Sequence, residues 1–135
     1  MQIDELLKLM VDKGASDLHL TVPSPPVFRV DGVLLPEEDL PPLTAEDIEL
    51  AFEQVSTQEQ RETFARKLEL DIAYSISGLA RFRVNVLQQR GTMSIAFRFI
   101  PFKLPTIDEL GLPQICKSLI LKPRGLILVT GAAGS

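Results

Sequence analysis

The fold is decided by two alternating stretches, ARFRVNVL at residues 80–87 and SIAFRFI at residues 94–100. Successive side chains of a strand point to opposite faces of a sheet, so each stretch separates its apolar residues from its charged and small ones. One face then carries Phe82, Val84, Val86, Ile95, Phe97 and Phe99, and the other carries Arg81, Arg83, Asn85, Ser94, Ala96 and Arg98. The pattern predicts an antiparallel hairpin with one buried face and one open face.

The turn of this hairpin sets which residues face each other. A two-residue turn at Arg90-Gly91 pairs positions whose numbers sum to 181, which places Arg83 directly opposite Arg98. A slip of one residue would set an arginine against a phenylalanine and mix the two faces, so we expect this register. Arg81 should lie about 7 Å from Arg83 on the same face.

The clustered arginines need a counter-charge, because like charges that face each other across two strands are destabilising. Arginine suits phosphate, since its planar guanidinium donates two parallel hydrogen bonds. The cluster therefore indicates a site for phosphate or for an acidic partner surface. The alternative interpretation is a solvated face that is balanced by acidic neighbours such as Glu69 and Asp71.

Upstream of the hairpin, the sequence predicts helices and further strands. Helices are expected at residues 3–11, ending before Gly14, at residues 45–55 after the N-cap Thr44, and at residues 56–68, where Ser56 and Glu59 form a capping box. Strands are expected at residues 17–20 and 70–76, with a hairpin over residues 27–35 that turns at Asp31-Gly32. These elements predict an α+β domain over residues 1–100, an antiparallel sheet with helices.

Prolines mark a change of organisation near residue 101. None occurs between residues 43 and 100, whereas Pro101, Pro105, Pro113 and Pro123 follow. We expect an interdomain linker over residues 101–112 and a helix over residues 113–121, with proline at its favoured first position. Residues 126–129 are all apolar, which predicts a strand buried on both faces as the start of a second, α/β domain over residues 113–135.

A glycine-rich turn follows that predicted strand, which is where phosphate-binding loops occur. The Walker A pattern G-x-x-x-x-G-K-[ST] is matched by its first five positions, Gly131, Ala132, Ala133, Gly134 and Ser135. Small residues there let backbone N–H groups turn towards phosphate oxygens. The match is partial, so we expect a chain cut inside the loop; the alternative is a flexible end.

Composition narrows the function classes. The net charge of −4 argues against nucleic-acid binding. The single cysteine, Cys116, excludes an internal disulfide, and no histidine or second cysteine lies near it in sequence, so no metal site is predicted. No apolar run approaches the roughly 18 residues of a membrane span, and the acidic start is no secretory signal. A cytoplasmic protein is expected.

Several segments in order resemble the PilT family of type IV pilus retraction ATPases, within the secretion ATPase superfamily. They are GASDLHL at 14–20, PPVFRVDG at 25–32, LPPL at 40–43, ARFRVN at 80–85, FRFIP at 97–101 and PRGLILVTG at 123–131. The resemblance implies a PAS-like amino-terminal domain, a linker, and the first helix and strand of a RecA-like ATPase domain. It also implies a homohexameric ring that powers pilus retraction and twitching motility, ATP with Mg²⁺, and an inner-membrane platform protein as partner.

The family's site residues can be placed on this sequence by motif. Arg83 and Arg98, with Arg81 as a weaker third, correspond to arginines that reach the ATP phosphates, and residues 131–135 correspond to the start of the P-loop. The family loop usually begins Gly-Pro-Thr-Gly-Ser, and the alanines here fit the same backbone. We expect peripheral contact with the inner face of the cytoplasmic membrane, and no ATP hydrolysis by these 135 residues alone.

Three alternatives stay open. The chain could be a free-standing PAS-like regulatory or binding module without ATPase activity. It could instead belong to an accessory retraction ATPase, or to an extension ATPase, although its short amino terminus disfavours the extension type. His19 is expected to be a structural hydrogen-bonding residue rather than a catalyst.

Overall fold

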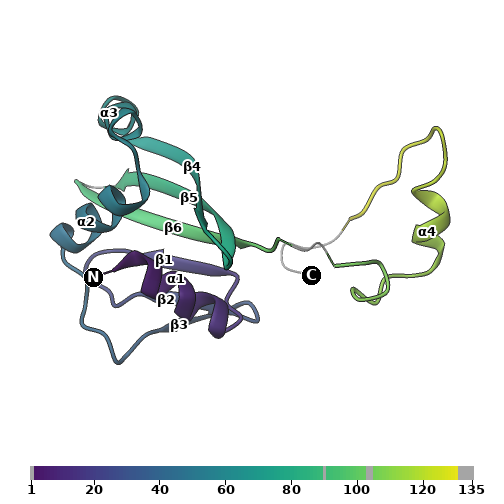
Figure 1. The fold of residues 1–135 in the computed structure, drawn as a ribbon, viewed down its shortest axis with the longest axis horizontal. Helices are drawn as coiled ribbons and strands as arrows, with labels where there is room; N and C mark the ends of the chain where they lie inside the picture. Colours follow the sequence, from purple (N-terminus) through teal and green to yellow (C-terminus); the bar gives the residue numbers. More distant parts are fainter. Residues whose placement is uncertain (1, 90, 103–104, 131–135) are drawn as a thin grey trace. The chain divides into compact units, whose positions relative to one another are not determined.

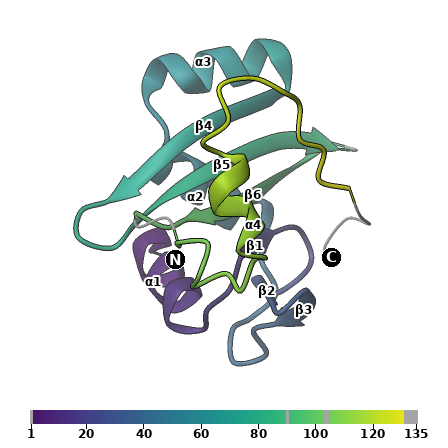
Figure 2. The ribbon, with the colours of Figure 1, turned by 90° about the vertical axis from the view of Figure 1, so that its right-hand side faces the viewer.

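The computed structural model describes residues 2–89, 91–102 and 105–130. The chain divides into two compact units, Met1–Pro101 and Phe102–Ser135, which are described separately. The first unit contains a six-stranded sheet in the order β3-β2-β1-β6-β5-β4 (Figure 1, Figure 2). All neighbouring strands are antiparallel. This sheet with its helices confirms the predicted α+β class.

The elements of the first unit follow the predicted order closely. The helices are α1 (Ile3–Asp12), α2 (Ala45–Val55) and α3 (Gln58–Lys67). The strands are β1 (Asp17–Leu20), β2 (Val27–Val30), β3 (Val33–Pro36), β4 (Glu69–Ile76), β5 (Ala80–Gln89) and β6 (Thr92–Ile100).

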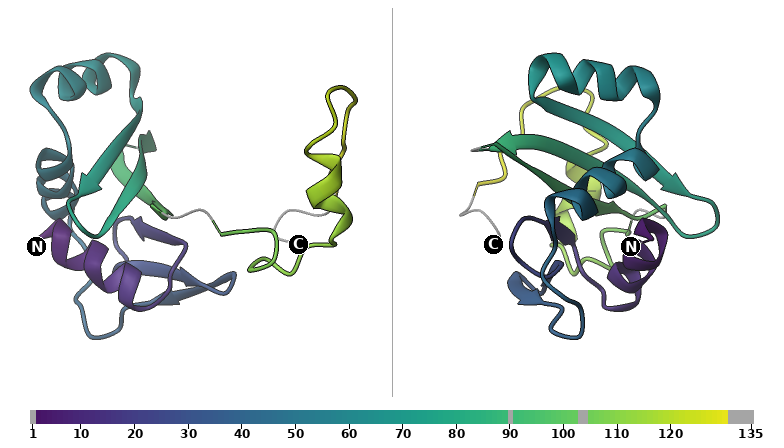
Figure 3. Two further views of the ribbon diagram at one scale, coloured as in Figure 1. Left: turned by 45° about the vertical axis from the view of Figure 1, so that its right-hand side comes forward. Right: turned by 90° about the vertical axis from the view of Figure 1, so that its left-hand side faces the viewer.

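One face of the sheet is covered by helices. In the right-hand view of Figure 3, α1 and α2 lie in front of the strands, and α3 lies beside β4. The core contains Leu7 and Met10 of α1 and Ile48 of α2, packed with sheet residues such as Phe82 and Phe97. Phe52 and Phe64 join α2 to α3 by an edge-to-face contact, with ring centroids 5.1 Å apart. Burial of this apolar area is the main stabilising force of the unit.

The register of the β5–β6 hairpin is the predicted one. Gln89 pairs with Thr92, and Arg83 stands directly opposite Arg98. Gly91 has φ +83°, a left-handed conformation that glycine adopts without strain, while the other turn residue, Arg90, lies outside the described residues. The β2–β3 turn is also confirmed, because Asp31 and Gly32 have the positive φ values of 49° and 81° that a type I′ turn requires.

The capping boxes show one confirmed prediction and one error. Thr44 caps α2, accepting a hydrogen bond from the Asp47 backbone N–H while the Asp47 carboxylate accepts from the Thr44 N–H. The predicted box at Ser56 and Glu59 is wrong, because Thr57 and Gln60 form the box that begins α3. The Ser56 hydroxyl instead donates to the Phe52 carbonyl at the end of α2. Both pairs have the three-residue spacing, so spacing alone could not distinguish them.

The second unit differs from its prediction. Its helix α4 spans only Ile115–Leu119, rather than residues 113–121, and Pro113 precedes the N-cap residue Gln114. Residues 125–130 form no strand, and the side chains of Leu126 and Val129 are 83% and 96% exposed. A strand requires a hydrogen-bonded neighbour and a short helix requires a packing surface, and the described residues of this unit supply neither. None of the helices in the described residues is long and apolar enough to span a bilayer.

Candidate functional site

The arginine cluster lies on the sheet face opposite the core, here called the open face. Strand alternation puts Phe82, Val84 and Phe97 into the core, with 0% exposure, and turns Arg83 and Arg98 outwards. Antiparallel pairing then extends the row across the sheet, because Arg98 stands opposite Asp17 of β1 and Asp17 stands opposite Arg29 of β2. The row therefore reads Arg29, Asp17, Arg98, Arg83 across four strands.

Asp17 joins two of these arginines. Arg98 Nε donates to Asp17 Oδ1 at 3.0 Å, and Arg29 Nε lies 3.4 Å from Asp17 Oδ2. The Ser16 hydroxyl also donates to Oδ2, at 2.8 Å. Burial opposes ionisation of Asp17, but the hydrogen bonds from Ser16 and Arg98 and the charge of Arg98 outweigh it and hold its pKa below the usual value.

Arg83 has a different carboxylate. Its Nε and one terminal nitrogen both donate to Asp71, which lies on β4 one strand away. These hydrogen bonds lower the pKa of Asp71, and the same interaction raises the pKa of Arg83. Both side chains are exposed, Arg83 by 61% and Asp71 by 41%, so water and salt weaken the pair. Asp71, an acidic neighbour named in the alternative interpretation, therefore pairs with Arg83. The Arg83 guanidinium is exposed, so an anion can still reach it.

Arg81 lies at the end of the same face. It is exposed and pairs in register with Ile100 of β6. Among the described residues, no ion pair or hydrogen bond holds its guanidinium. The structure therefore brings Arg83 and Arg98 face to face and leaves Arg81 beside them without an anchor.

His19 also belongs to the open face. It pairs in register with Ala96 and Val27, so it lies one row from Asp17 and Arg98. Its Nε2 is buried and has no hydrogen-bond partner among the described residues. Burial lowers the pKa of His19, while the Asp17 carboxylate acts in the opposite direction. The predicted structural hydrogen bond is therefore not found at this nitrogen.

A cavity of about 250 Å³ opens at this cluster. Its lining includes Asp17, His19, Asp71, Arg83 and Arg98. The wall carries two guanidiniums and the two carboxylates that pair with them, so an anionic oxygen group would be received by the guanidinium nitrogens that the carboxylates leave free. In the part of the chain that the structure describes, no group of three or more His, Cys, Asp or Glu residues could hold a metal ion.

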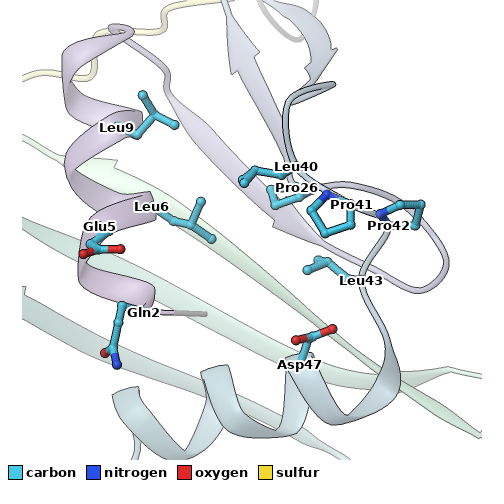
Figure 4. Close-up of a pocket in the computed structure, with 10 residues that line it drawn as sticks. All are labelled: Gln2, Glu5, Leu6, Leu9, Pro26, Leu40, Pro41, Pro42, Leu43 and Asp47. Atoms are coloured by element: carbon cyan, nitrogen blue, oxygen red, sulfur yellow. The ribbon is translucent and has the colours of Figure 1, made fainter.

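A second hollow, of about 350 Å³, has a different character. Its walls are the leucines of α1 and of the loop that leads to α2, with prolines between them (Figure 4). Glu5 and Asp47 stand at its edge. It shares no lining residue with the cavity at the arginines, and its walls carry no guanidinium.

Two residues of the site were missed by sequence reasoning, Asp17 and Arg29. The alternation in DLHL at residues 17–20 already separates Asp17 and His19 from the two leucines. What the sequence did not indicate is that β1 pairs with β6, a contact between residues 81 positions apart for Asp17 and Arg98. Of the predicted site residues, Gly131, Ala132, Ala133, Gly134 and Ser135 lie outside the described residues.

Known proteins similar to this chain include type IV pilus ATPases. The type IV pilus retraction ATPase PilT of Pseudomonas aeruginosa is 42% identical over all 135 residues, and the type IV pilus ATPase PilU of that organism is 39% identical over the same length. A twitching motility protein of Neisseria gonorrhoeae is 34% identical over 110 residues. No protein-family model matches the chain.

The solved structures that are similar to this chain include a pilus retraction motor and a further ATPase. The crystal structure of the pilus retraction motor PilT with bound ADP matches the whole chain with a TM-score of 0.78 and 38% identity. The ATPase DotB of Legionella pneumophila matches 91% of the chain with a TM-score of 0.72 and 21% identity, which shows the fold alone. The chain spans 39% of the PilT sequence and 35% of the PilU sequence. By sequence over its whole length and by fold, this chain is a relative of the PilT-type type IV pilus ATPases.

Proposed function

We propose that this chain is the amino-terminal portion of a hexameric ATP-driven motor that powers type IV pilus retraction and twitching motility. Its relatives at 42% and 39% identity are named as type IV pilus ATPases, which supports ATP hydrolysis by the full-length protein. The similar PilT structure holds ADP, which supports a nucleotide as ligand. The chain spans about two-fifths of these relatives, so the activity is proposed for the full-length protein.

The observation that carries the proposal is the pair of exposed arginines that face each other on the open face. Arg83 and Arg98 are adjacent across two strands, and each has a carboxylate beside it. Arginines that stabilise charge on a transferred phosphoryl group can raise its rate 10³-fold or more. We propose that Arg83 and Arg98 contact the ATP phosphates, with Arg81 as a weaker third contact.

The remaining parts of the nucleotide site are proposed from the resemblance. By the resemblance, residues 131–135 correspond to the first five positions of the loop that would cradle the phosphates with backbone N–H groups. Magnesium comes with ATP and neutralises charge on its phosphates, and no residue of this chain is assigned to it. Like subunits complete a homohexameric ring, and an inner-membrane platform protein receives the force. The motor acts in the cytoplasm, at the inner face of the cytoplasmic membrane, with no nucleic-acid partner.

The test begins with the reading frame beyond codon 135. Gly-Lys-Ser or Gly-Lys-Thr after Ser135 completes the Walker A loop, and the full-length protein is then assayed for ATP turnover. Arg98→Ala should lower turnover about 10³-fold. Arg66→Ala, at an exposed arginine of α3 away from the open face, is the matched control and should keep the parent rate.

Two outcomes contradict the proposal. A stop codon after Ser135 would leave a free-standing PAS-like module that acts through partners, without ATPase activity. Normal turnover in Arg98→Ala would show that the arginine cluster takes no part in ATP hydrolysis, even if the full-length protein hydrolyses ATP.

A further inference from the structure

Asp17 occupies the centre of the charged row on the open face. Its two oxygens are shared between strands on either side, because Oδ1 accepts from Arg98 of β6 at 3.0 Å and Oδ2 lies 3.4 Å from Arg29 of β2. The Ser16 hydroxyl adds a third contact, at 2.8 Å to Oδ2. Three groups therefore fix the direction of this carboxylate.

Asp17 is also far less exposed than the arginine it holds. Its side chain is 12% exposed, whereas that of Arg98 is 67% exposed. A free arginine side chain samples many rotamers, and ordering it costs conformational entropy. Because the largely buried Asp17 carboxylate already holds Arg98 in one orientation, this entropy is lost on folding and not when an anion binds.

The contact between Asp17 and Arg98 uses only Nε and leaves the two terminal guanidinium nitrogens of Arg98 available. Asp17 takes only the Nε–H of this guanidinium, and no other hydrogen bond to Arg98 occurs within the described residues. The two terminal nitrogens can therefore donate in parallel to phosphate oxygens. In contrast, Asp71 engages both Nε and a terminal nitrogen of Arg83, so a phosphate must compete with it.

We propose that Asp17 is a positioning residue for Arg98, which it holds through Nε so that the terminal nitrogens meet the phosphate of a bound nucleotide. Arg29 keeps the carboxylate charge-compensated on its other side. The inference rests on the proposed function, because that function assigns Arg98 to the ATP phosphates. It adds a residue that acts through Arg98 and does not itself touch the nucleotide.

The test is a double-mutant cycle on ATP turnover of the full-length protein. Asp17→Asn keeps the size of the side chain and removes its charge, and should lower kcat about 10- to 100-fold with a smaller change in KM, the cost of a misplaced group. The double variant with Arg98→Ala should be no slower than Arg98→Ala alone, because Asp17 then has nothing to position. Asp39→Asn, in an exposed loop, is the matched control and should keep the parent kcat.

The outcomes separate this inference from the proposed function. Unchanged kcat in Asp17→Asn, or a loss that adds to that of Arg98→Ala, overturns the inference alone, because a merely structural role gives additive losses. Normal turnover in Arg98→Ala overturns both. If Asp17→Asn does not fold, Ser16→Ala removes the 2.8 Å hydrogen bond to the carboxylate. That variant should give a smaller drop in kcat, which again disappears on the Arg98→Ala background.

Discussion

The two faces of one sheet differ in what holds them. On the covered face, Phe82 and Phe97 are 0% exposed and packed under helices. On the open face, the side chains of Arg83 and Arg98 are 61% and 67% exposed and are held by carboxylates. Because neighbouring residues of the same strands supply both faces, the core sets the register and the register places the arginines.

The difference teaches that stability and function are separable by residue position in this sheet. Changes at buried residues of the covered face should lower the free energy of unfolding strongly, and changes at the exposed residues of the open face should leave it nearly unchanged. The predictions below test that separation, in order of decreasing effect on the free energy of unfolding.

Phe82→Ala should have the largest effect. Removing a fully buried phenylalanine leaves a cavity and costs about 3–5 kcal/mol of unfolding free energy, a large part of a typical domain's stability. Urea denaturation of the 135-residue chain, followed by circular dichroism, measures the loss. Arg81→Ala, the exposed neighbour on the same strand, is the control and should shift the midpoint little; equal losses in the two variants would contradict the separation of faces.

Thr57→Ala should have a medium effect, because it removes the capping box that begins α3, a helix of the covering layer. Loss of an N-cap hydroxyl costs about 1 kcal/mol. Ser56→Ala is the informative comparison, since its hydroxyl bonds at the end of α2 and should contribute less. A larger loss in Ser56→Ala than in Thr57→Ala, measured by urea denaturation, would show that the cap is wrongly placed.

Tyr74→Phe should cost about 1 kcal/mol at neutral pH, because its hydroxyl donates to Asp4 Oδ1 at 2.7 Å and ties α1 to β4. Burial and this hydrogen bond raise the pKa of Tyr74 from 10.0 to about 12. The folded-state pKa lies above the ordinary value, so the contribution is complete below pH 10.0 and is lost as pH rises towards 12. Thermal unfolding across that range should show the loss in the parent chain and a smaller one in Tyr74→Phe; parallel curves would refute the prediction.

Asp71→Asn should have the smallest effect on stability, since its ion pair with Arg83 is exposed on both sides. The urea midpoint should stay near that of the parent chain at low salt, and any difference should vanish at high salt. A shift as large as that of Tyr74→Phe, persisting in high salt, would mean that the open face contributes to stability as well.

The sequence predicted the first unit well because its signals are local. Alternation over residues 80–87 and 94–100 predicted the register, and Asp31-Gly32 predicted the β2–β3 turn. The site was predicted only in part, since Arg83 and Arg98 lie on one hairpin, whereas Asp17 and Arg29 come from strands brought together by long-range pairing. A sequence pattern assigns a residue to a face, but it does not say which strand lies next to it.

The second unit shows the opposite case. Residues 126–129 carry the apolar pattern of a buried strand, yet they form none and are exposed. The pattern reports what a segment could bury, and strand formation also needs neighbouring strands to supply hydrogen bonds. The same limit applies to α4, since Ile115 and the C-cap residue Ile120 are exposed and the described residues of this unit form no core around them.

The central claim is that the open face serves a nucleotide while the covered face serves the fold, and Arg83→Ala in the full-length protein tests it most directly. Turnover of ATP and the urea midpoint are measured on the same purified variant. The account predicts a loss of turnover of about 10³-fold with an unchanged midpoint. Parent-like turnover, or a loss of turnover that only follows a loss of folded protein, would contradict it.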